Sequence, residues 1–131
     1  MTLKIEISEQ EPGVYLVIPE GEINTQTCSI LETKVMNDVV PKAKAVIIEM
    51  GKVSYISSMG LSTIFRIKLA MEGRQGTMAL VNMQPKVQEV FETMKILSPQ
   101  MFATLHEADE YMDGFLDKVQ KGIIKPRKPQ E

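Results

Sequence analysis

The sequence is poor in the residues from which disulfides and metal sites are built. Its 131 residues include one cysteine, Cys28, and one histidine, His106. A lone cysteine excludes an intramolecular disulfide, and one cysteine with one histidine argues against a metal site. The protein must therefore fold around a hydrophobic core, for which a single domain of this length is sufficient.

Long apolar runs and an excess of positive charge are also missing. No run approaches the roughly 20 residues that a membrane-spanning helix needs. Residues 1–6 have neither the apolar segment nor the small-residue cleavage site of a secretory signal. We therefore expect a cytoplasmic protein without a membrane span. The formal net charge of -2 argues against a nucleic-acid partner and favours a protein partner.

The motifs of common enzyme classes are absent. Neither a G-x-x-x-x-G-K-[ST] loop nor a G-x-G-x-x-G turn is present, so nucleotide hydrolysis is not predicted. His106 could act as a base toward Cys28 or a serine, but the pattern favours a surface histidine and a buried thiol. Asp109, Glu110 and Asp113 are typical of the solvated face of an amphipathic helix. We expect no enzyme activity, no metal and no cofactor.

Apolar periodicity predicts an α/β fold, because helical and strand patterns alternate after an initial hairpin. This order indicates a mixed β-sheet of about four to five strands, with about four helices packed on it and right-handed crossovers. Residues 1–120 would form the domain, and 121–131 a flexible basic, proline-containing tail. The expected elements are a hairpin in 3–18, a helix capped by Asn24 or Thr25, a doubly covered strand at 45–48, a helix at 58–72, a strand at 77–81, a helix opened by Pro85, a strand at 102–105 and a last helix from about residue 108.

The stretch VSYISSMGLST, residues 53–63, carries two adjacent serines at the start of a predicted helix. Ser57 or Ser58 can cap the helix by accepting a bond from a free backbone N–H group. Alternatively, one of them is a regulatory hydroxyl, because a helix N-terminus suits an anion and residues 51–71 contain no Asp or Glu. Gly60 disfavours a helix and therefore indicates close approach of another backbone.

Four segments follow one another along the chain: PEGEINTQT, AVIIEMGKVSYISSMGL, GTMALVNMQPKVQEVFETMKI and FATLHEADEYM. Over roughly residues 3 to 118, they resemble the STAS domain, specifically the stand-alone anti-sigma factor antagonists. PEGEINTQT is similar to the G-E-[IL]-D loop of this family, and AVIIEMGKVSYISSMGL to its strand, loop and D-S-S-G-L signature. GTMALVNMQPKVQEVFETMKI and FATLHEADEYM resemble the strand and helix pairs that follow.

The resemblance implies a partner-switching cycle. The unphosphorylated protein would bind a GHKL-type serine-kinase anti-sigma factor, and phosphorylation would release it. A PP2C-type serine phosphatase would reverse the mark. Alignment on Gly60 and Leu61 places the phosphoacceptor on Ser58, with Ser57 as a less favoured acceptor and the better candidate for capping.

The implied partner surface contains three departures from the family pattern. Ser57 and Asn24 stand where aspartate is usual, and Met59 stands where a small residue is usual. Alternatives from the same fold are a scaffold or transporter accessory subunit that is not phosphorylated, and a small-molecule-binding STAS module. The expected partner-binding residues are Glu22, Asn24, Ser57, Ser58, Met59, Gly60, Leu61 and Ser62.

Overall fold

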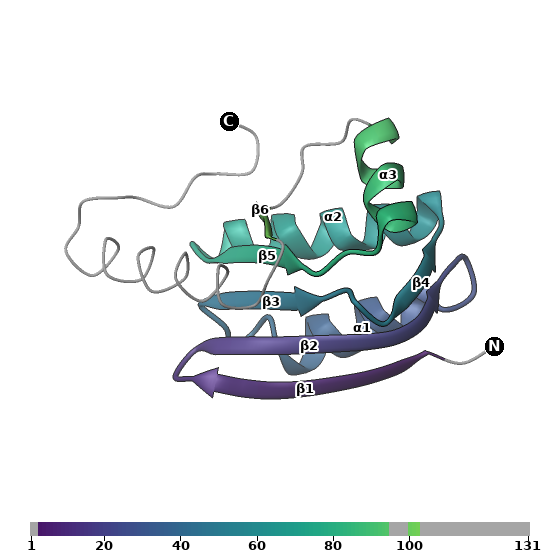
Figure 1. Ribbon diagram of the computed structural model, residues 1–131. Coiled ribbons are helices and arrows are strands. Elements are labelled where there is room, and N and C mark those ends of the chain that lie inside the picture. The colour runs from purple at the N-terminus through teal and green to yellow at the C-terminus, as the bar shows by residue number, and fades with distance from the viewer. Residues whose placement is uncertain (1–2, 95–99, 103–131) are drawn as a thin grey trace.

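The alternating residues near the N-terminus form a β-hairpin in the computed structural model, which describes residues 3–94 and 100–102 (Figure 1). Strand β1 (Lys4–Glu11) pairs antiparallel with β2 (Val14–Ile23). Gly13 has a φ of 85° in the turn between them, a conformation that glycine adopts without steric cost. The hairpin forms one side of the sheet.

The other strands of the sheet run parallel to β2. They are β3 (Ala45–Glu49), β5 (Thr77–Val81) and β6 (Gln100–Phe102), giving the order β1-β2-β3-β5-β6. A short strand, β4 (Val53–Ile56), lies off this path and pairs in parallel with the end of β2. This pairing brings the start of the following helix beside the loop that leaves β2.

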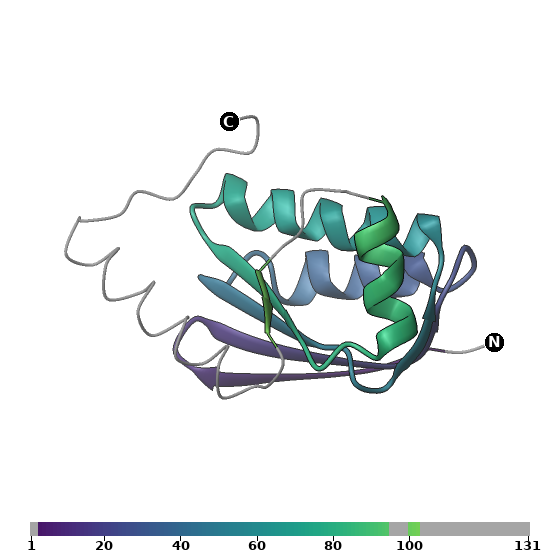
Figure 2. The same cartoon turned by 45° about the horizontal axis from the view of Figure 1, so that its top comes forward.

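Three helices lie within the described residues: α1 (Cys28–Asp38), α2 (Ser58–Gly73) and α3 (Pro85–Met94). Helices α1 and α2 lie side by side on one face of the sheet, while α3 lies near β4 (Figure 2). Both α1 and α2 start at the end of the sheet where β2 and β4 finish. Their N-termini therefore share one end of the molecule.

Strand β3 is buried on both faces, as the continuous apolar run at 45–48 predicts, and so is the neighbouring β5. On the helix side, Val46 and Ile48 of β3 belong to the main core, together with buried residues of α1 and α2. On the other side, Ala45 and Ile47 belong to a smaller cluster with residues of β2 and β5. The side chains of successive residues in β3 thus point to opposite faces of the sheet.

The predicted α/β class with a mixed sheet is confirmed, and so are the expected hairpin, the strand at 77–81 and the helices from Ser58 and Pro85. Strand β4 was not predicted. The predicted residues 103–105 of the last strand, the last helix with its acidic residues, His106 and the tail lie outside the described residues. No helix in the described ranges is long and apolar enough to cross a membrane.

Candidate functional site

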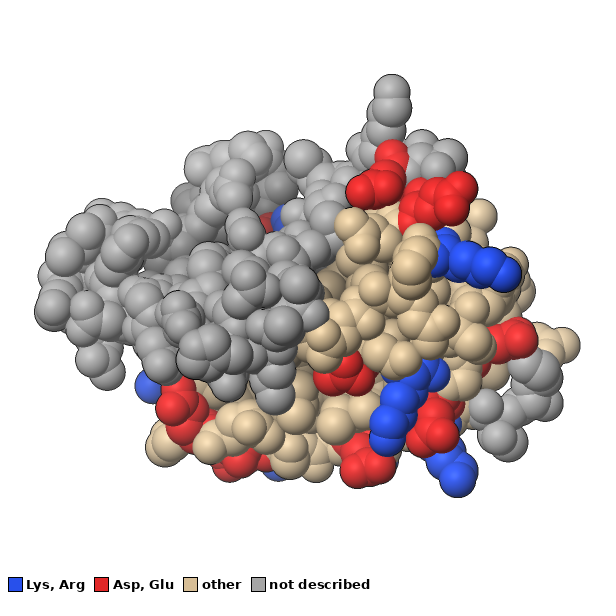
Figure 3. Space-filling view, viewed as in Figure 1, with Lys and Arg blue, Asp and Glu red and all other residues tan. Residues whose placement is uncertain are grey.

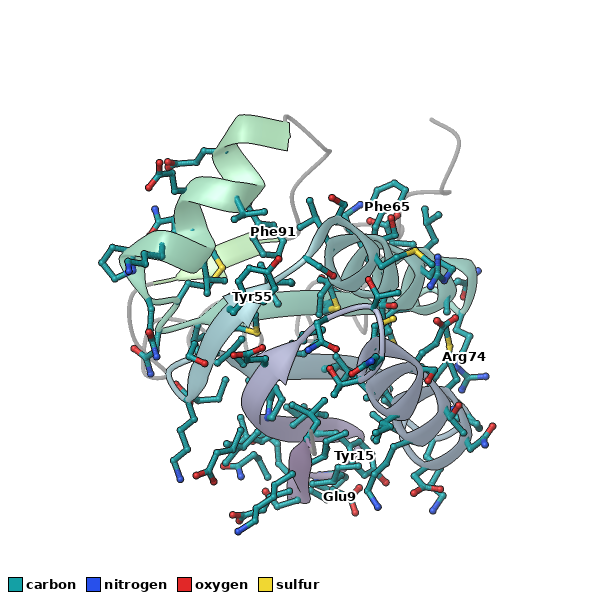
Figure 4. The ribbon with its side chains drawn as sticks, turned by 90° about the vertical axis from the view of Figure 1, so that its right-hand side faces the viewer. Glu9, Tyr15, Tyr55, Phe65, Arg74 and Phe91 are labelled. Carbon is teal, nitrogen blue, oxygen red and sulfur yellow. The ribbon has the colours of Figure 1, made fainter. Side chains whose placement is uncertain are left out.

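Two connections meet at one end of the sheet, the end that faces the viewer in Figure 4. Ile23 of β2 pairs in register with Ile56 of β4. Just beyond this pair, the backbone N–H of Ser57 donates a hydrogen bond of 2.9 Å to the carbonyl oxygen of Ile23. The β2–α1 loop and the start of α2 are therefore held together by the sheet itself.

Ser57 is the N-cap of α2. Its backbone is extended, with φ -91° and ψ 172°, and its hydroxyl accepts a hydrogen bond of 3.0 Å from the N–H of Gly60. This bond satisfies one of the N–H groups that the first helical turn leaves without an intrahelical partner. The prediction that Ser57 caps the helix is confirmed.

Ser58 is the first residue of α2, and its side chain is exposed. Among the interactions within the described part of the chain, none engages the Ser58 hydroxyl. The first turn of α2 contains no acidic residue. Ser58 therefore presents a free hydroxyl at the positive end of a helix dipole, whereas the neighbouring hydroxyl is committed to the cap.

Gly60 allows α2 to approach β2 and β4 closely. A Cβ atom at this position would lie 2.6 Å from the carbonyl oxygen of Ile23, 2.8 Å from Cγ2 of Ile23 and 2.9 Å from Cγ1 of Ile56. No side chain larger than a hydrogen fits without displacing backbone. The predicted close approach of another backbone is confirmed, and that backbone is β2.

The loop after β2 is held by Asn24 and Thr27. The Asn24 side-chain oxygen accepts hydrogen bonds of 2.9 Å from the N–H groups of Gln26 and Thr27. Thr27 Oγ1 accepts from the Asn24 N–H at 2.9 Å and donates to the Glu22 carbonyl oxygen at 2.6 Å. The cap predicted at Asn24 or Thr25 is wrong, because these bonds fold an extra turn and move the N-cap of α1 to Thr27.

The other residues of the expected partner surface fall into two groups, those that solvent reaches and those that are buried. The Met59 side chain is 50% exposed, and Glu22 and Ser62 are half-buried. Gly60 and Leu61 are buried, which corrects their placement on the partner surface. Both face the core because α2 turns them toward β2 and β4, so they position the site from beneath.

Sequence reasoning missed Tyr55, which lies directly before the serine pair. Its side chain is 50% exposed although it is part of β4. Figure 4 shows it on the side of β4 that faces α3. The sequence around it reads Val53, a polar residue, Tyr55 and Ile56, and does not alternate regularly between apolar and polar residues. The reason is that β4 is short and lies outside the main strand order.

A second feature that the sequence did not reveal is an ion pair between α1 and α2. Arg66 Nε and Nη2 donate to the two carboxylate oxygens of Glu32 at 3.0 and 2.7 Å, and Nη2 also donates to Thr63 Oγ1 at 3.1 Å. The hydrogen bond from Arg66 lowers the pKa of Glu32, and the Glu32 carboxylate raises the pKa of Arg66. The pair links α1 and α2 through two charge-assisted hydrogen bonds.

Charge is scarce around Ser58. Residues 23–31 and 53–65 contain no charged side chain, and these two segments are joined by the Ser57–Ile23 hydrogen bond. In Figure 3, an uncharged area lies where α3 and β4 meet, with charged side chains above it, below it and to its right. Within the described ranges, no group of His, Cys, Asp or Glu side chains could hold a metal ion.

Comparisons with known proteins agree with this geometry. The family model described as STAS domain matches residues 7–108. A protein of Bordetella bronchiseptica described as an anti-sigma factor antagonist, BtrV, is 29% identical over 96 residues, which are 73% of this chain and 83% of that protein.

Solved structures share the fold at lower identity. An anti-sigma factor antagonist of Thermotoga maritima superposes with a TM-score of 0.75 at 21% identity, covering 85% of this chain and 94% of that chain. The anti-sigma factor antagonist SpoIIAA in its unphosphorylated form gives a TM-score of 0.65 at 16% identity, covering 89% and 98%. SpoIIAA has also been solved in a phosphorylated form, with a TM-score of 0.66 at 17% identity, covering 82% and 98%.

Proposed function

Because the chain belongs to the STAS domain family, we propose that it is an anti-sigma factor antagonist in a partner-switching cycle. Unphosphorylated, it binds a GHKL-type serine-kinase anti-sigma factor. Phosphorylation of Ser58 releases that partner, and a PP2C-type phosphatase restores the binding form. The protein acts in the cytoplasm as a binding switch rather than as an enzyme.

The observation that carries this proposal is that the two serines have different structural roles. Ser57 holds the cap through its bond to the Gly60 N–H, whereas the Ser58 hydroxyl is exposed and not engaged within the described residues. A kinase can reach Ser58 without breaking a structural hydrogen bond. Ser57 is half-buried and its hydroxyl is held by the Gly60 N–H, so it is less accessible to a kinase than Ser58.

The surroundings of Ser58 suit a phosphate. A phosphoserine carries about 1.5 to 2 negative charges and offers three acceptor oxygens. At the start of α2 it would lie against backbone N–H groups and the positive end of the helix dipole, and no carboxylate lies in residues 53–65. The fold therefore tolerates the charge of the phosphate. The phosphate instead lowers the stability of the complex with the docked partner.

Release requires only a modest free-energy change. A docked partner would have to desolvate the phosphate and lose the hydrogen bond made by the free hydroxyl. A loss of about 3 kcal/mol weakens binding by about two orders of magnitude. Rearrangement of the fold is not needed, because the change lies on the surface of α2.

The test is a phosphorylation assay with the GHKL-type serine kinases encoded in the same genome as this protein. Wild type, Ser58→Ala and Ser57→Ala are incubated with each kinase and ATP, and the products are separated on a phosphate-affinity gel. We expect one kinase to shift wild type and Ser57→Ala but not Ser58→Ala.

Thermal melting of each variant checks that the absence of a mobility shift on the gel is not caused by unfolding of the variant. A shifted band that persists in Ser58→Ala would remove Ser58 as the acceptor. If no kinase modifies wild type, the switch is overturned in favour of a STAS scaffold or transporter accessory subunit that is not phosphorylated, or of a small-molecule-binding STAS module.

A further inference from the structure

We infer that the partner docks on an uncharged face whose apolar anchors, Tyr55 and Met59, lie on either side of Ser58. The partner surface that contacts these two side chains is an apolar, uncharged recess. This inference rests on the proposed function, since it names the chemistry of the partner that Ser58 controls. It also predicts how the switch works: phosphorylation places a charge at the centre of a contact whose two anchors, Tyr55 and Met59, are uncharged.

The first observation is the placement of exposed apolar side chains. Among the described residues, the exposed large hydrophobic side chains are Ile30 at 43%, Tyr55 at 50% and Met59 at 50%. Two of these three lie within four positions of each other and flank Ser58. The Cα atoms of Tyr55 and Ser58, three residues apart, are separated by at most about 11 Å, well within a single contact area.

The second observation is that the backbone carrying these two side chains is held in place. Tyr55 lies on a strand paired with β2, and Met59 lies in the first turn of a helix whose cap and close packing fix its start. Neither position is needed for the core, because Val53, Ile56, Leu61 and Ile64 fill it from the same two elements. Tyr and Met are both enriched at the centres of protein interfaces.

The third observation is the absence of charge in residues 23–31 and 53–65, which meet at this end of the sheet. One carboxylate borders this face: Glu22 of β2 pairs in register with Tyr55, and its Oε1 accepts from the Asn24 amide at 3.5 Å. Lys52 and Arg66 border the second segment, and Arg66 is paired with Glu32. A partner charge buried between Tyr55 and Met59 would find no counter-charge within residues 53–65, which is costly. The matching partner surface is therefore apolar.

The experiment uses the kinase that modifies wild type in the phosphorylation assay as the binding probe. Its affinity is measured by calorimetry for full-length wild type, Tyr55→Ala, Met59→Ala and the control Ile30→Ala, all unphosphorylated. We expect Tyr55→Ala to weaken binding about 10-fold or more and Met59→Ala at least about 5-fold. Ile30 is an apolar residue on α1 with a slightly lower exposure of 43% and does not flank Ser58, so Ile30→Ala should stay within about 2-fold.

Two further measurements separate anchoring from other effects. Tyr55→Phe and Met59→Leu keep the apolar contact and should restore affinity to within about 3-fold of wild type. Raising sodium chloride from about 0.05 to about 0.5 M should change the wild-type affinity less than about 3-fold, because few charges are screened. Melting temperatures equal to that of wild type show that each variant is folded.

The outcomes distinguish this inference from the proposed function. If wild type is phosphorylated on Ser58 and binds the kinase, but Tyr55→Ala and Met59→Ala bind as wild type does, the docking face is wrong and the switch stands. A strong loss of affinity with salt, reproduced by Glu22→Gln, likewise overturns the uncharged interface. If wild type neither binds nor is modified by any of the kinases, both the function and the face are overturned.

Discussion

Ser57 and Ser58 are adjacent in sequence, but only the first is committed to holding the fold. The Ser57 hydroxyl bonds to the N–H of Gly60, and the Ser58 hydroxyl points to solvent. We expect Ser57→Ala to lower the free energy of unfolding by about 0.5 to 2 kcal/mol, the usual loss for a removed N-cap. Chemical denaturation measures this difference.

Ser58→Ala is the matched control for that loss, since it deletes the same hydroxyl one position along the chain. Its stability should stay within about 0.5 kcal/mol of wild type, as for surface changes that break no specific contact. Equal destabilisation by both variants would show that the two serines share the cap.

Gly60 supports a second prediction at this scale. Gly60→Ala should destabilise the protein by about 1 to 3 kcal/mol, because its Cβ would meet the Ile23 carbonyl oxygen at 2.6 Å and the backbone must shift. Gly73, at the other end of α2, has nothing within 4 Å of an added Cβ. Gly73→Ala should therefore be neutral or slightly stabilising, since alanine favours a helix. Melting of the two variants side by side tests the contrast.

The ion pair between α1 and α2 is the main feature at the scale of elements. Arg66 and Glu32 are partly exposed, with side-chain exposures of 45% and 30%, so the pair stabilises the fold only modestly. We expect a double-mutant cycle with Glu32→Gln and Arg66→Gln to give a coupling of about 0.5 kcal/mol or less near neutral pH.

The coupling should depend on pH in one direction. Arg66 lowers the pKa of Glu32 in the folded protein below its usual value of 4.5. The stabilisation is therefore complete above that value and is lost as the pH falls through the lowered folded pKa, where the carboxylate takes up a proton. A coupling measured by denaturation that grows as the solution is acidified would contradict this assignment.

Most elements could be predicted from the sequence because their signals are local. The run at 45–48 is continuously apolar, and Ser57, Gly60 and Pro85 mark helix starts through capping, close packing and a fixed φ. Strand β4 could not be predicted, since it has only 4 residues and is defined by its pairing with β2. The start of α1 was misplaced because Asn24 and Thr27 bond to each other in an extra turn.

The site was predictable in part for the same reason. The order of Ser57, Ser58 and Gly60 predicts a capped helix start, whereas the choice of Ser57 for the cap and Ser58 for the free hydroxyl came from the family resemblance. Tyr55, Glu32 and Arg66 required the fold, because an exposed residue on a strand and a contact between two helices depend on packing. Likewise, burial of Leu61 beneath the expected surface depends on how α2 turns against β2 and β4.

At the scale of the whole molecule, the switch should change binding without changing the fold. Ser58→Asp places a negative charge at the exposed first position of α2, where the helix dipole favours it and no buried contact is disturbed. We expect its melting temperature to stay within a few degrees of wild type, about the shift that 1 kcal/mol produces. Calorimetry should show weaker kinase binding by Ser58→Asp than by Ser58→Ala.

The measurement that tests the central claim most directly compares the affinity of the kinase for this protein before and after quantitative phosphorylation on Ser58. Mass spectrometry establishes the position and completeness of the modification, and titration by calorimetry gives both dissociation constants. The account predicts that phosphorylation weakens binding by about two orders of magnitude, equivalent to about 3 kcal/mol, and that treatment with a serine phosphatase restores it. Equal affinities for the two forms would contradict it.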